Sequence, residues 1–317
     1  MFRKILSVLN PTVFVLSLCF QIILIYTIIR HSPKNLSTLK AILLTNCCFQ
    51  LLQSSMVFFT QIQLVNHLVP IELWSYGPCR HFEAFMCYSM FHILQTSSLV
   101  SGLTVFLTTF MKYQAARHVR PSKKKNCFVI LFISSIVLIS AGCGILLVII
   151  QALPLEIREK YYRINLELDE YSVIGIVDYS VLPSRVNGII INGLVVIVPI
   201  TCLLLRRKIL KLLTASSDAL YFQNRVFLQG LTLQIFGHTL VYVPIFICST
   251  ISLITKTEYT FAQFFIFVLP HLTTVIDPLL TMYFVTPYRK RLMVWLRLKN
   301  DKVHSVSPST FAVSANH

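Results

Sequence analysis

The chain has 317 residues, of which 55% are hydrophobic and only 13% are charged, and its mean hydropathy is +0.71. Soluble domains carry about 25% charged residues, so 28 Lys and Arg with 12 Asp and Glu are too few to coat a soluble protein of this length. The apolar excess also excludes an intrinsically disordered chain, and nine cysteines are too sparse for a disulfide scaffold.

Seven apolar stretches of at least 18 residues follow one another along the chain. Each is long enough to cross about 30 Å of hydrocarbon as a helix, and the need to pair backbone amides inside the bilayer favours helices over strands. Arg3 and Lys4 before the first stretch resemble a signal peptide, but the stretch is long and has no small-residue cleavage site, so we expect it to remain as a span. The expected spans are Thr12–Ile29, Ala41–Val65, Ala84–Met111, Cys127–Gln151, Asn187–Leu205, Leu231–Thr255 and Gln263–Val285.

The basic residues are divided unevenly between the two sides of these spans. Twenty Lys and Arg lie in the first, third and fifth loops and the C-terminal segment, against eight on the other side. Because positive charge is retained in the cytoplasm, we expect the N-terminus outside the cell and the C-terminus inside. The net charge of +16 is then a feature of the inner membrane surface, facing anionic lipid and acidic partners, and no nucleic-acid binding is expected.

No linker rich in Gly, Ser or charge divides the chain, so residues 1–299 are expected to form one seven-helix domain and residues 300–317 a polar cytoplasmic tail. The long outer loop, Ala152–Val186, is expected to fold over the extracellular mouth of the bundle. The inner loop Arg206–Gln229 has the pattern of helical extensions of both flanking spans. Basic and apolar residues interleaved at helical spacing over Pro287–Lys299 predict an amphipathic helix on the inner leaflet.

Asp277 is the only formally charged residue within the expected spans. A central Asp costs about 2.5–3.5 kcal/mol on insertion scales, so it should face the bundle interior. It could act in a conformational switch, or it could simply accept hydrogen bonds near Asn46, Gln50 or Thr281. Prolines within the last three spans add kinks that can serve as pivots, although kinks also occur in passive bundles; these are Pro199, Pro244, Pro270 and Pro278.

Other polar side chains at membrane depth are candidates for a ligand pocket or for ordinary hydrogen bonding between helices. His238 and Tyr242 are four residues apart and so share a helix face, while His92 and His271 lie in the outer halves of their spans. No histidine pair has the local spacing of a metal site, and no catalytic or nucleotide-binding motif is present, so we expect no metal, no cofactor and no enzymatic activity. The pocket candidates are His92, Gln95, His238, Tyr242 and His271.

Cys79 and Cys87 lie near the outer end of the third span, in an oxidising compartment. Eight helical residues would separate their Cα atoms by about 12 Å, too far for a disulfide. A bridge therefore requires Cys79 to lie outside the helix, and the sequence leaves this open.

The chain resembles a known receptor family. Seven spans, an outer N-terminus, a basic second inner loop and an amphipathic helix after the last span are similar to a G-protein-coupled receptor. Three motifs resemble more specifically the Srd class of nematode serpentine chemoreceptors, over roughly residues 8–297. They are Ser75-Tyr76-Gly77-Pro78-Cys79-Arg80-His81-Phe82, the run Asp277–Phe284 with Pro287-Tyr288-Arg289, and Ser32-Pro33-Lys34-Asn35-Leu36.

The resemblance implies a chemosensory receptor that binds an external small molecule, an odorant or a pheromone, and signals to a heterotrimeric G protein. It implies the plasma membrane as the location, with a sensory cilium as the more specific expectation, and leaves pairing with a second receptor open. Lys112 stands where the wider receptor class has an arginine. A transporter or a ligand-gated channel subunit is the alternative. The implied switch residues are Asp277, Pro278, Tyr283 and Pro244, and the implied G-protein contacts are Lys112, Tyr113, Arg117, Arg120, Arg206 and Arg207.

The charge count makes the orientation testable. An epitope fused before Met1 should bind antibody on intact cells, because the positive charge holds the opposite side of the bundle in the cytoplasm. An epitope placed after His317 should be detected only after permeabilisation. The sequon at Asn35 should carry no glycan, and an N-glycan there would reverse the predicted orientation.

Overall fold

The computed structural model describes residues 2–32, 37–65, 71–116, 123–153, 171–213, 218–255, 263, 266 and 268–296. The polar tail, Asn35 and part of the long outer loop lie outside these residues. The helices are α1 (Phe2–His31), α2 (Ser37–Thr60), α3 (Ala84–Ala116), α4 (Lys123–Gln151), α6 (Leu182–Leu213), α7 (Asp218–Thr255), α9 (Val268–Phe284) and α10 (Thr286–Trp295), with a short 3-10 helix, η2 (Pro78–His81).

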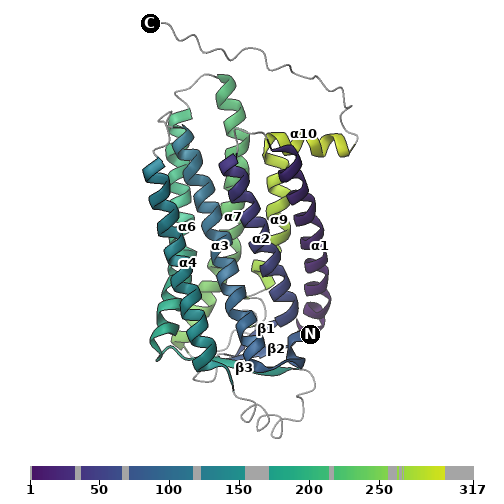
Figure 1. Ribbon diagram of the computed structural model, residues 1–317, viewed down its shortest axis with the longest axis vertical. Coiled ribbons are helices and arrows are strands. Elements are labelled where there is room, and N and C mark those ends of the chain that lie inside the picture. Colours follow the sequence, from purple (N-terminus) through teal and green to yellow (C-terminus); the bar gives the residue numbers. More distant parts are fainter. Residues whose placement is uncertain are drawn as a thin grey trace.

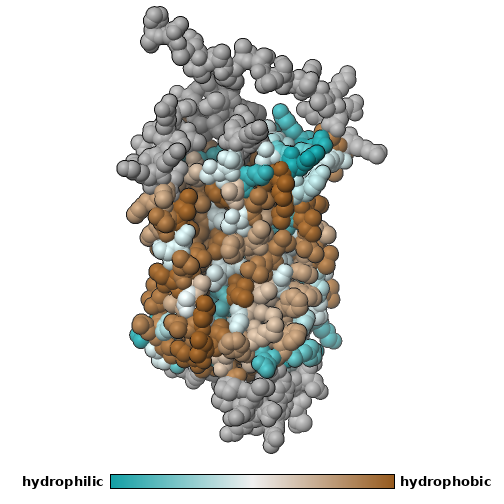
Figure 2. Space-filling view, viewed as in Figure 1, coloured by the Kyte–Doolittle hydropathy of each residue, from teal (hydrophilic) through white to brown (hydrophobic). Residues whose placement is uncertain are grey.

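These helices form a seven-transmembrane bundle, as predicted (Figure 1). Six of them are long and apolar enough to cross a membrane by themselves. The seventh span is α9, and the chain bends by 95° between α9 and α10. Figure 2 shows apolar side chains over the middle of the bundle and hydrophilic ones towards its ends, the distribution that a hydrocarbon layer demands. The inner loop also follows the prediction, because α6 continues to Leu213 and α7 begins at Asp218.

The amphipathic helix after the seventh span is present as α10. Pro287 occupies its first turn, where the missing backbone N–H leaves no hydrogen bond unmade. The side chain of Tyr288 is 1% exposed, and its hydroxyl lies 2.7 Å from the hydroxyl of Ser32 at the end of α1. The ring of Trp295 lies 6.1 Å from that of Tyr26, also in α1. Both contacts hold α10 against the inner end of α1.

The second span ends earlier than its hydropathy predicts. Helix α2 ends at Thr60, and Gln61 adopts the left-handed conformation (φ 40°) that turns the chain out of the helix. Residues Ile62–Val65, predicted to continue the span, instead form the strand β1. The prediction was wrong here because three apolar residues and one glutamine at the end of a helix look the same in hydropathy as a short strand.

A three-stranded antiparallel sheet, which the sequence analysis did not predict, lies across the N-terminal end of the bundle (Figure 1). Its order is β1 (Ile62–Val65), β2 (Ile71–Ser75), β3 (Ser172–Val177). Strand β3 comes from the long outer loop, so the described part of that loop does fold over the end of the bundle. The sheet thereby joins two loops whose paired residues are about 100 positions apart in the chain.

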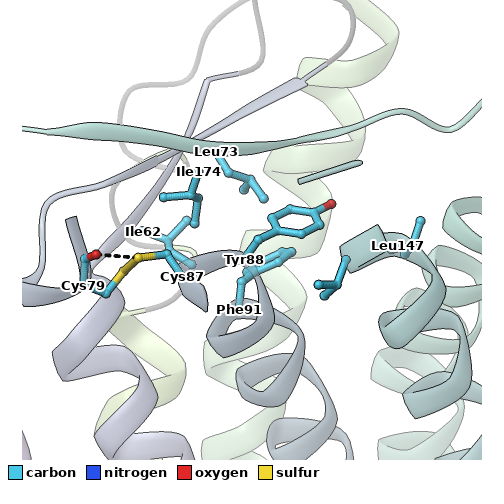
Figure 3. Close-up of a cluster of buried hydrophobic side chains, with 9 residues drawn as sticks. Ile62, Leu73, Cys79, Cys87, Tyr88, Phe91, Leu147 and Ile174 are labelled. Atoms are coloured by element: carbon cyan, nitrogen blue, oxygen red, sulfur yellow. Dashed lines mark hydrogen bonds between the residues drawn. A yellow bond between two sulfur atoms is a disulfide. The ribbon is translucent and has the colours of Figure 1, made fainter. Parts of the chain in front are cut away.

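The sheet is fixed to the bundle by a buried cluster at the outer ends of α3 and α4 (Figure 3). Tyr88 of α3 is fully buried there and donates a hydrogen bond of 2.7 Å from its hydroxyl to the carbonyl oxygen of Ile176. A disulfide joins Cys79 to Cys87. Cys79 lies in η2, outside α3, and the two Cα atoms are 5.6 Å apart, within the range for such a bond.

Gly175 of β3 should tolerate no side chain. A Cβ there would collide with the ring of Tyr88, whose hydroxyl is hydrogen-bonded to the sheet at Ile176. Gly175→Leu should therefore lower the unfolding free energy by about 1–3 kcal/mol, the usual cost of overpacking. Thermal unfolding of the purified receptor checks this. Gly142→Leu is the control, because nothing lies within 4 Å of its Cβ position, and equal stability of both variants would contradict the packing described.

Candidate ligand cavity and buried polar network

A cavity of about 840 Å³ lies among α3, α6 and α7. Its size is in the range of small-molecule sites. The walls are mostly apolar, with Phe91 and Leu99 of α3, Val198 of α6, and Ile235 and Phe246 of α7 among them. Strand residues form the outer part of its lining, contributed by Leu64, Ile71 and Val177.

Four of the five predicted pocket residues line this cavity: His92, Gln95, His238 and Tyr242. The rings of His238 and Tyr242 are stacked, with centroids 6.0 Å apart, as their spacing on one face of α7 requires. Gln95 lies where α3, α4 and α6 are connected by hydrogen bonds. Its amide oxygen accepts a hydrogen bond of 3.2 Å from Asn187 of α6, whose own side-chain oxygen accepts one from Ser140 of α4.

His271, the fifth predicted pocket residue, is placed elsewhere. Its side chain is completely buried between α9 and α2, and its ring Nε2 lies 2.7 Å from the hydroxyl of Ser54. It does not line the cavity, because the face of α9 that carries it packs directly against α2. Among the described residues, no group of three or more His, Cys, Asp or Glu side chains is arranged to hold a metal ion.

Asp277 lies in a buried network of polar side chains next to the cavity. Gln50 of α2 donates a hydrogen bond of 2.6 Å from its amide nitrogen to Asp277 Oδ2 and one of 3.2 Å to the hydroxyl of Ser101 in α3. Gln21 of α1 donates a bond of 2.5 Å to the amide oxygen of Gln50. Four helices are therefore linked through Gln50, one of the three partners that the sequence suggested for Asp277.

One side chain belongs to both the cavity and the network. His238 lines the cavity, and its Nε2 atom lies 3.6 Å from Asp277 Oδ2. The ring is held from its other side, because Nδ1 lies 2.9 Å from the carbonyl oxygen of Gln234 one turn earlier in α7. A molecule in the cavity that contacts His238 is thus one side chain away from the buried carboxyl group.

The profile of the family described as "Serpentine type 7TM GPCR chemoreceptor Srd" matches residues 6–294. The chain belongs to the Srd family. It is 37% identical to serpentine receptor class delta-40 of Caenorhabditis elegans over 316 residues, which cover 98% of each chain. Serpentine receptor class delta-45 and class delta-47 of the same organism are 35% and 36% identical, over 94% and 93% of this chain and 95% of each relative. The family is one of chemoreceptors rather than of enzymes.

In this Srd receptor the predicted switch residues differ in their surroundings. Pro278 is buried in α9 beside Asp277, whereas Pro244 in α7 is exposed on the bundle surface. Tyr283 is 49% exposed and packs on the ring of Phe284, away from the network. The buried tyrosine at this end of the Srd bundle is Tyr288, whose role sequence reasoning missed although it lies in the quoted Pro287-Tyr288-Arg289 motif.

The predicted G-protein contacts that are described lie at the inner helix ends. Lys112 and Tyr113 lie near the end of α3 and are half-buried. In the inner extension of α6, Arg206 is half-buried and Arg207 is exposed. These two pairs therefore belong to the same end of the bundle as α10 (Figure 1). Arg117 and Arg120 lie outside the described residues.

Gln50 should be the most important side chain of the network for stability. Gln50→Leu removes three hydrogen bonds and leaves Asp277 without its amide donor, so we expect a loss of about 1–2 kcal/mol in unfolding free energy. Thermal unfolding of the purified receptor in detergent measures this loss of unfolding free energy. Gln234→Leu, which removes one bond to Thr281, is the graded control and should cost less. A larger loss for Gln234→Leu would place the centre of the network elsewhere.

Proposed function

We propose that this receptor binds an external small molecule, an odorant or a pheromone, in the cavity among α3, α6 and α7, and that binding is signalled to a heterotrimeric G protein. The observation that carries the proposal is the position of His238. Its ring forms part of the cavity wall and also lies 3.6 Å from Asp277, within the network that links α1, α2, α3 and α9. A ligand in the cavity could therefore contact the same side chain that packs against Asp277 of α9.

The proposed switch is a change in the packing of α7 against α9. A ligand that bound more tightly to one position of His238 would favour the helix arrangement compatible with that position, since a ligand shifts an equilibrium only by its difference in affinity. Pro278, next to Asp277, removes a backbone hydrogen bond from α9 and gives that helix a place to bend. Asp277, Pro278 and Pro244 are therefore the proposed switch residues, while Tyr283 points away from the network.

The proposed G-protein surface is the inner end of the bundle. It would comprise Lys112, Tyr113, Arg206 and Arg207, together with Arg117 and Arg120 of the second inner loop. Their positive charge complements an acidic partner as well as anionic lipid. The proposed location is the plasma membrane, with the sensory cilium as the compartment suited to a chemoreceptor, and the proposal holds for a single chain or for a pair.

A cavity-filling substitution tests the ligand site. Nothing lies within 4 Å of the Cβ position of Gly102, and this residue lines the cavity. In cells screened with volatile and water-soluble small molecules for a cyclic-nucleotide response, Gly102→Trp should raise the half-maximal concentration of an agonist by about tenfold or more, a loss of 1.4 kcal/mol.

Gly142→Trp is the matched control, because its Cβ position is equally open and it does not line the cavity. It should leave the response unchanged. Surface expression of both variants, measured with the N-terminal epitope, separates loss of binding from loss of folding. Equal responses of the two variants at equal expression would place the ligand site outside this cavity.

A further inference from the structure

The wall of the cavity is closed on some sides and open on others. The side chains that α3 and α4 contribute are all buried or half-buried; Leu147 and Gln151 of α4 are each 3% exposed. The lining residues of the three strands are likewise half-buried. Exposed lining residues come only from the segment before α6, from α6 itself and from α7, within the part of the chain that the structure describes. They are Tyr179, Arg185, Ile189, Asn192, Val196 and Thr250.

Four of these residues form a stripe along α6. Arg185, Ile189, Asn192 and Val196 are spaced by four, three and four residues, the spacing of one helix face. Each belongs to the cavity wall and is also exposed on the outside of the bundle. From Ile189 to Val196 the stripe extends about 10 Å along the helix axis.

This opening lies at the depth of the hydrocarbon. Helix α6 is a membrane span from Leu182 to Leu212. Only 6% of the residues in its most apolar part are buried inside the protein, against 56% in α3. Ile189 is 73% exposed, and in a bilayer that surface faces lipid. Asn192 carries an amide on the same face, where a polar group without a partner is costly. An amide at the edge of an opening can instead hydrogen-bond to a molecule passing through it.

We infer that the cavity opens sideways into the bilayer along α6 and receives an uncharged, mostly apolar molecule that has first dissolved in the membrane. The sheet β1–β2–β3 covers the outer end of the bundle above α3 and α4, which leaves the flank of α6 as the accessible side. No carboxylate is among the described lining residues, and the one cation, Arg185, stands at the outer rim. The inference deepens the proposed function by naming the ligand class and its source.

A photoreactive phospholipid provides the test, because it cannot reach the cavity through water. The receptor is placed in bilayers that contain a phosphatidylcholine with a diazirine on one acyl chain, irradiated, and mapped by peptide mass spectrometry. Adducts are expected on Leu99 of α3 and Ile235 of α7, which line the cavity and are 8% and 3% exposed. Adducts on the lipid-facing residues Phe128 and Leu131 of α4 serve as the reference.

Filling the cavity should remove the interior adducts only. Gly102→Trp should lower adducts on Leu99 and Ile235 about tenfold relative to those on Phe128, and Gly142→Trp should not change the ratio. Gly102→Leu adds a smaller side chain and so provides a second variant in case Gly102→Trp does not fold. It should lower the ratio of interior adducts to Phe128 adducts by less than Gly102→Trp does. Interior adducts that are absent from the native receptor, or equal in Gly102→Trp and Gly142→Trp, would overturn the lateral opening.

Competition tests the charge of the ligand. At equal mole fraction in the bilayer, 1-decanol should lower the interior adducts, and decyltrimethylammonium should not, because the lining offers a cation no carboxylate. The reverse order would overturn the assignment of an uncharged ligand. None of these readouts uses signalling. Interior adducts in a receptor that answers no agonist would refute the proposed function alone, and a responsive receptor without them would refute the lateral opening alone.

Discussion

The hydrocarbon core of the membrane offers no hydrogen-bond partner, and the interior of this protein is arranged around that constraint. Polar side chains in the spans must satisfy one another, so Gln21, Gln50, Ser101 and Asp277 converge from four helices. Without such pairing, each buried amide or carboxyl group would cost several kcal/mol. The network fixes α1, α2, α3 and α9 relative to one another. Helices α6 and α7 bury a smaller share of their side chains than α1, α2 and α3 do.

At the outer end of the bundle, the helices are held by the sheet and a disulfide. The sheet formed by β1, β2 and β3 pairs two loops, and the disulfide between Cys79 and Cys87 ties η2 to the start of α3. Tyr88 joins sheet and helix by burial and by its bond to Ile176. Because this end is held at α3 and α4, the cavity has one firm side and one side made of the less buried α6 and α7. That asymmetry suits a site whose occupant arrives from the side and acts on α7.

Membership of the Srd family accounts for the seven spans, and the structure shows which side chains connect the helices to one another. His238 belongs to both the cavity and the polar network, since it lines the cavity and lies beside Asp277. The inner end carries basic residues of α3 and α6 together with α10, which is held to α1 through Tyr288. In the proposed switch, a change in the position of α7 would reach the inner end of the bundle through packed helices.

The sequence by itself determined the seven helices and the helix after the last span, because apolar length and helical spacing are local properties. Its motifs carried the resemblance to the family, and it named Gln50 as one of three candidate partners of Asp277. It could not determine the sheet, since its strands have only four to six residues and β2 pairs with β3 over about 100 positions. It also suggested His271 for the pocket, because hydropathy gives the depth of a residue but not the direction in which its helix face points, and it gave no role to Tyr288, which is 1% exposed. Only tertiary packing rotates each helix about its axis, and that rotation decided which side chains enter the cavity, which join the network and which face the lipid.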